Sequence, residues 1–173
     1  GGEPVIACYF AVFNSPTELW PGCIEQIAPG AFSSSLGGDV RALVDHETRL
    51  VLGRTTAGTL TLREDESGLY GEIKINPNDS DAMNLYARVQ RGDVSQCSFG
   101  FEIVSEDYIV GSDGQTCTWT IHDLILYEVS VVTFPAYEAT SAYARDAGDM
   151  ASLRTARLNR RRQELLERIN KLC

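Results

Sequence analysis

The sequence lacks long apolar runs, paired cysteines and histidine clusters, and each absence excludes a class of protein. Because no run of 18 apolar residues occurs, no membrane-spanning helix is expected. With two histidines, His46 and His122, a histidine-rich metal site is excluded, and we expect no metal and no cofactor. The five cysteines form no C-x-x-C pair, and their odd number argues against a full disulfide framework, which is typical of a reducing cytoplasm.

The charge is divided unevenly along the 173 residues. Residues 1–144 contain 7 Lys and Arg against 20 Asp and Glu, a net charge of −13, whereas residues 145–173 contain 8 against 4, a net charge of +4. We expect residues 1–144 to form one globular domain and residues 145–173 a basic helical tail. The acidic domain is a poor nucleic-acid binder, and the arginines of the tail fit the solvated side of a helix better than a nucleic-acid contact.

Most of the first 137 residues read as short β-strands separated by turns. Residues 58–65 and 69–75 predict a hairpin, and residues 79–81 cap a predicted helix over residues 82–89 that stops at Gly92. Further strands are predicted over residues 5–13, 22–27, 39–44, 96–105 and 116–133. Strands at a spacing of about ten residues predict a mainly β fold with helices, arranged as a barrel or a sandwich.

Ser98 is the first candidate for chemistry. In a strand over residues 96–105, Phe99 faces the core while Ser98 and Gly100 face the other way, and Gly100 leaves room for another chain to approach. An unremarkable polar residue on an exposed strand face would give the same pattern. Cys97 is a rival nucleophile, but on the apolar face it fits a small buried residue better.

A serine nucleophile needs a base, and a third group that orients the base. His46 is the better candidate, since it follows an apolar strand at a position typical of a cleft rim, whereas His122 fits a surface or structural role. Glu128 is the only ionisable carboxylate in the very apolar segment 124–135, so it needs a partner, either an imidazole or other polar groups.

Several segments together resemble the prohead serine proteases of tailed bacteriophages, a family related in fold to the herpesvirus assemblins. These segments are residues 27–32 with 35–36, then 43–46, 52–55, 58–62, 91–101 and 126–137. The resemblance implies a serine endopeptidase with Ser98 as nucleophile, His46 as general base and Glu128 as orienting acid. It keeps His122 as an alternative third member and implies the Ala136 amide as an oxyanion donor.

The resemblance also implies a closed β-barrel of about seven strands, a dimer, and a position inside the prohead in the bacterial cytoplasm. The implied partners are the major capsid protein with its scaffold segment, and the protease's own termini as substrates. The heptad-like leucines of residues 145–173 resemble the start of a scaffold region that would bring the protease to its substrate. The alternatives are a catalytically silent assembly domain and a basic-tailed nucleic-acid binder.

Overall fold

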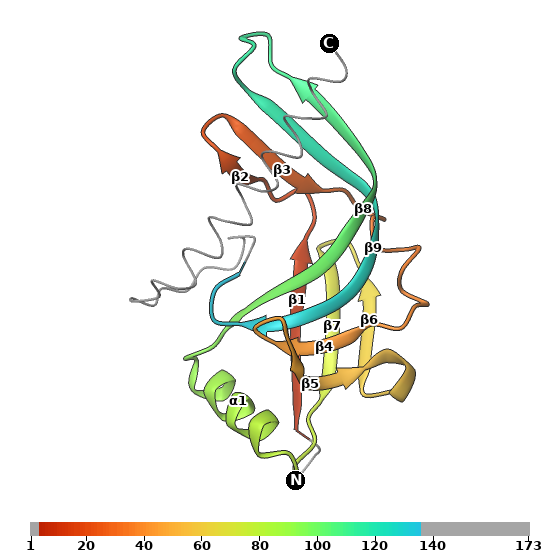
Figure 1. Ribbon diagram of the computed structural model, residues 1–173, viewed down its shortest axis with the longest axis vertical. Coiled ribbons are helices and arrows are strands. Elements are labelled where there is room, and N and C mark those ends of the chain that lie inside the picture. The colour runs from red at the N-terminus through yellow and green to blue at the C-terminus, as the bar shows by residue number, and fades with distance from the viewer. Residues whose placement is uncertain (1–3, 136–173) are drawn as a thin grey trace.

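Two β-sheets pack against each other around the main apolar core, and a helix lies at one end (Figure 1). The computed structural model describes residues 4–135. The strands are β1 (Val5–Val12), β2 (Thr17–Trp20), β3 (Cys23–Ile27), β4 (Arg41–Val44), β5 (Glu47–Arg54), β6 (Leu60–Glu64), β7 (Gly68–Lys74), β8 (Gln96–Val110) and β9 (Cys117–Val132). The helices are the 3-10 turn η1 (Thr55–Ala57) and α1 (Ser80–Arg91).

The predicted hairpin and helix are confirmed. β6 and β7 pair as antiparallel neighbours. Helix α1 begins after Asp79, whose side chain accepts hydrogen bonds from the backbone N–H groups of Asp81 and Ala82, and it ends at Gly92. Gly92 has a φ of 85°, the left-handed conformation that closes a helix without a Cβ penalty. These local signals are strong because they depend on neighbouring residues only.

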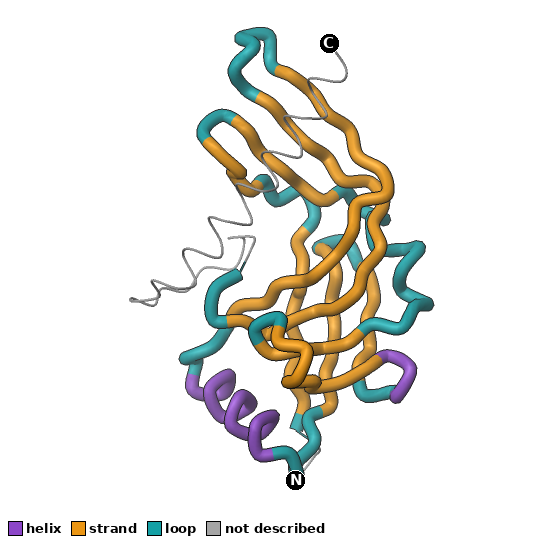
Figure 2. Tube along the Cα trace, in the orientation of Figure 1, coloured by secondary structure: helices purple, strands orange, loops and turns teal. Residues whose placement is uncertain are grey.

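The larger sheet is built on one long hairpin, β8–β9, which runs along most of the molecule (Figure 2). Strand β9 carries two parallel neighbours in succession: β3 lies along its first half and β4 along its last residues. β2 extends the sheet beyond β3, and β5 extends it beyond β4. The smaller sheet has the order β1-β7-β6.

The expected closed barrel of about seven strands is wrong for residues 4–135. Nine strands form a three-stranded and a six-stranded sheet, and no ladder of hydrogen bonds joins the two within these residues. The mainly β prediction is correct. Closure was not predictable because strand patterns report local alternation, whereas closure depends on which distant edges pair.

The core lies between the sheets and fixes the direction of the side chains on β8. Phe99 is 1% exposed, and its ring lies 5.3 Å from that of Phe32 and 4.9 Å from that of Phe101. Because side chains alternate along a strand, anchoring Phe99 in the core turns Ser98 and Gly100 to the opposite face. The aromatic contacts therefore set which way the candidate nucleophile points.

Cys23 and Cys117 form a disulfide between β3 and β9, where they lie opposite each other in the parallel register. The expectation of reduced cysteines is wrong for this pair, although one bridge is not a framework. The sequence did not reveal it because the two residues lie 94 positions apart. Cys8 and Cys97 are free thiols.

Within residues 4–135 no helix has the length and apolar character needed to cross a membrane. The predicted tail, residues 145–173, lies outside the described residues.

Candidate active site

A strained turn carries His46. Val44 pairs with Glu47, so Asp45 and His46 form a two-residue β-hairpin loop between β4 and β5. Both have positive φ angles, 47° and 61°, as a type I′ turn requires, although neither is glycine. Such strain persists only where surrounding contacts hold the backbone, and strained residues cluster at active sites.

Hydrogen bonds to the end of β9 hold this turn. The backbone N–H of Asp45 donates to the Val131 carbonyl at 3.0 Å, and the N–H of His46 donates to the Ser130 hydroxyl at 3.1 Å. The Asp45 carboxylate accepts from the Thr133 N–H at 2.8 Å. Because these contacts tie the turn to β9, the imidazole is positioned next to that strand.

The structure brings His46 and Glu128 together. Nδ1 of His46 lies 2.6 Å from Oε1 of Glu128, and the two side chains are 31% and 15% exposed. A carboxylate only accepts, so Nδ1 carries the proton and donates it. This tautomer leaves Nε2 free to accept a proton from a nucleophile, which is the arrangement of base and orienting acid in serine hydrolases.

Ser98 lies on the same strand face as Glu128 and next to it in register. It pairs with Ser130 across β8 and β9, and Gly100 pairs with Glu128. Ser98 is 1% exposed, so the interpretation of it as a polar residue on an exposed strand face is wrong. Its hydroxyl has no hydrogen-bond partner among residues 4–135, and so it is not bonded to His46 in this state. Catalytic hydrogen bonds often tighten only when substrate is bound.

Gly100 makes room for a side chain and not for a second chain. A Cβ at Gly100 would lie 2.3 Å from Oε1 of Glu128, closer than any real contact. The carboxylate therefore occupies the space that the missing side chain leaves. The expectation of a close approach at Gly100 is correct, but its occupant was misidentified.

The rival groups lie elsewhere. His122 is exposed, and its Nε2 lies 2.9 Å from Oδ2 of Asp107, so it does not contact His46. Cys97 is buried, and the neighbouring Cys8 side chain, followed by burial, raises the pKa of its thiol far above the usual value. A thiol with so high a pKa supplies no thiolate nucleophile.

Two residues that hold the site were not singled out from the sequence. They are Asp45 and Ser130. A signal for Ser130 was present, because it stands two positions after Glu128 and so shares its strand face. The role of Asp45 could not be read from the sequence, because the type I′ turn itself was not recognisable there. The second residue of such a turn is commonly glycine, and here it is His46.

The remaining candidates lie outside this geometry. Ala136, the implied oxyanion donor, lies outside the described residues. No group of three His, Cys, Asp or Glu side chains within residues 4–135 is arranged to hold a metal.

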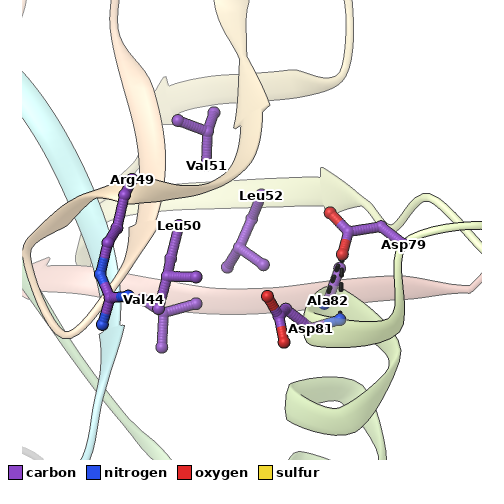
Figure 3. A pocket seen from close by; sticks show the side chains of 8 residues that line it. All are labelled: Val44, Arg49, Leu50, Val51, Leu52, Asp79, Asp81 and Ala82. Atoms are coloured by element: carbon purple, nitrogen blue, oxygen red, sulfur yellow. Dashed lines mark hydrogen bonds between the residues drawn. The ribbon is translucent and has the colours of Figure 1, made fainter.

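A pocket of about 140 Å³ lies between β5 and α1, lined by Leu50, Leu52 and Asp81 among others (Figure 3). Neither Ser98 nor Glu128 lines it, so it is separate from the candidate site.

Comparison with known proteins identifies the family. The family described as caudovirus prohead serine protease matches residues 1–152. The prohead protease of Enterobacteria phage HK97 is 33% identical over 153 residues, an alignment that covers 86% of this chain and 63% of that protein. No solved structure matches the chain. The chain thus spans under two thirds of this curated relative, and on the family match it belongs to the caudovirus prohead serine proteases.

Proposed function

We propose that the chain is a serine endopeptidase of prohead maturation that uses Ser98, His46 and Glu128. The observation that carries the proposal is the 2.6 Å contact between His46 Nδ1 and Glu128 Oε1 beside the strand face of Ser98. In the reaction, the Ser98 hydroxyl attacks the scissile carbonyl carbon while His46 Nε2 takes its proton. His46 then returns the proton to the leaving amine, and Glu128 stabilises the imidazolium between these steps.

The family and the related protease support a role inside the prohead. We propose as substrates the scaffold segment of the major capsid protein and the protease's own termini, and as active form a dimer inside the phage prohead in the host. Residues 145–173 would act as a basic helical appendage that joins the protease to scaffold. We propose the Ala136 amide as an oxyanion donor. Because Ser98 is 1% exposed, the reaction requires residues around it to move before a peptide can enter.

The same burial favours a second candidate function, a catalytically silent capsid-assembly domain. A buried hydroxyl without a partner is compatible with a serine that reacts with nothing. The two candidates differ in one chemical property, the reactivity of Ser98.

We expect a fluorophosphonate probe to label the folded chain at Ser98. Its hydroxyl oxygen attacks phosphorus, the P–F bond breaks and fluoride leaves, while His46 takes the hydroxyl proton. Intact mass and peptide mass spectrometry locate the adduct and give a second-order labelling rate constant. A His46→Ala variant should be labelled at least about a hundredfold more slowly, since general base catalysis contributes about 10²–10⁴-fold. A folded chain without an adduct at Ser98 would favour the silent domain.

Replacing Gly100 with alanine is expected to lower the labelling rate about a hundredfold, the cost of misplacing a catalytic group by about 1 Å. The new Cβ would lie 2.3 Å from Glu128 Oε1, so the carboxylate must move away from His46. Gly37→Ala is the matched control, because no heavy atom lies within 4 Å of a Cβ placed there. Circular dichroism establishes folding, and equal labelling rates for the two variants would contradict the role given to Gly100.

A further inference from the structure

Ser130 is a fully buried serine on β9 whose hydroxyl contacts two members of the candidate site. It is 0% exposed and lies directly opposite Ser98. Its oxygen accepts a hydrogen bond from the backbone N–H of His46 at 3.1 Å, and its O–H donates to Oε2 of Glu128 at 2.6 Å. One hydroxyl therefore joins the backbone of the proposed base to the carboxylate that orients it.

We infer that Ser130 is a positioning residue of the protease, an inference that rests on the proposed function. Through this hydroxyl it holds His46 and Glu128 in a common frame. Nδ1 of His46 binds one carboxylate oxygen of Glu128, and Ser130 binds the other, so neither oxygen is left to rotate freely. Ser130 makes no hydrogen bond to the Ser98 hydroxyl and acts through its two partners.

The backbone of His46 explains why such a contact is needed. With a φ of 61° the residue occupies a region that costs about 1–3 kcal/mol for a non-glycine residue, and the turn persists only if outside contacts hold it. The bond from the His46 N–H to Ser130 is a contact to the backbone of this residue itself. Without it, the turn would no longer hold the imidazole against Glu128.

Ser130 also affects the charge balance between His46 and Glu128. The O–H of Ser130 withdraws charge from the Glu128 carboxylate, and its removal would leave the carboxylate more able to stabilise a protonated imidazole. Four charged groups on the neighbouring elements have other partners. Arg41 binds Asp39, Glu47 binds Arg49, and Glu102 accepts from Tyr127. Asp45 accepts from Thr133.

The test compares Ser130→Ala with Ser35→Ala in the labelling reaction over a range of pH. Ser35 is the matched control, because its buried hydroxyl also bridges two groups, the Leu124 carbonyl at 2.8 Å and the Leu126 N–H at 3.0 Å, away from His46. We expect Ser130→Ala to be labelled about tenfold more slowly. We also expect the acid limb of its pH–rate profile to move to higher pH, because the carboxylate loses the hydrogen bond that the Ser130 hydroxyl donates. Ser35→Ala should leave that limb in place.

Each outcome bears on a different claim. A Ser130→Ala profile with the wild-type limb, whatever its rate, overturns the positioning role and leaves the proposed function intact. A folded wild-type chain without an adduct at Ser98 overturns the proposed function and this inference with it. If Ser130→Ala does not fold, Ser130→Cys keeps the site filled with a weak donor. It should then give an intermediate rate with a shifted limb, and a wild-type profile for this variant overturns the inference.

Discussion

Replacing Ser98 with alanine is expected to abolish peptide cleavage without lowering the stability of the chain. Loss of the nucleophile from a serine triad costs on the order of 10⁶ in kcat, so cleavage should fall by at least about a thousandfold. The Ser98 hydroxyl is buried without a partner among residues 4–135, and an unsatisfied buried group costs about 1–3 kcal/mol. Removing it should therefore leave Tm unchanged or raise it.

Both quantities can be measured on the same preparations. Intact mass spectrometry follows the peptides released from the chain itself and from a capsid-protein precursor, and thermal unfolding gives Tm. Ser105→Ala is the matched control, because Ser105 is an exposed serine on the same strand. Equal processing by the wild type and Ser98→Ala would rule out Ser98 as nucleophile. A marked fall in Tm would show that the hydroxyl has a stabilising contact in solution.

Replacing Glu128 with glutamine is expected to lower kcat by about 10⁴, as the corresponding change does in other serine triads. The two carboxylate oxygens of Glu128 accept from His46 Nδ1 and from the Ser130 hydroxyl. A glutamine has one acceptor oxygen and one NH₂ group, so it cannot accept both bonds. If the NH₂ faces His46, the imidazole must place its proton on Nε2 and can no longer accept one from Ser98. If it faces Ser130, the negative charge that stabilises the imidazolium is still lost.

The control for this change is Glu102→Gln. Glu102 is an exposed carboxylate on β8 that accepts one hydrogen bond, from the Tyr127 hydroxyl at 2.7 Å. Glu102→Gln makes the same chemical replacement outside the candidate site. A surface change of this kind alters the free energy of unfolding by under about 0.5 kcal/mol, so the chain stays folded. We therefore expect its cleavage rate to lie within about twofold of the wild-type rate, since about 0.5 kcal/mol corresponds to a factor of about two. If Glu128→Gln retained a tenth or more of the wild-type kcat, another group would have to orient His46.

Much of the secondary structure could be predicted because its signals are local. The hairpin of β6 and β7 follows from alternation and a turn, and α1 follows from the Asp79 cap and Gly92. Two strands were missed. β5 begins with exposed polar residues and buries only Leu52 and Gly53, so it lacks alternation, and β2 is four residues long.

The candidate residues Ser98, His46 and Glu128 were also selected from the sequence, by residue type and by their places in or directly after predicted strands, and the family resemblance then implied their roles. Their mutual geometry was not available there. His46 reaches Glu128, 82 positions away, only because β4 lies parallel to the end of β9 and a strained turn follows β4. The parallel pairing depends on long-range packing, which local patterns do not encode.

The sequence by itself determined a mainly β chain, an excess of acidic residues over residues 1–144, one capped helix and the choice of Ser98, His46 and Glu128 as candidates, since alternation, capping and residue chemistry are local properties. Tertiary structure decided that two sheets form where a barrel was expected, that Glu128 and not His122 contacts His46, and that Gly100 leaves space for that carboxylate. It also revealed Ser130, whose neighbours lie on β4, β8 and β9. These features arise only when distant strands come into register, because each depends on groups that the chain brings together on folding.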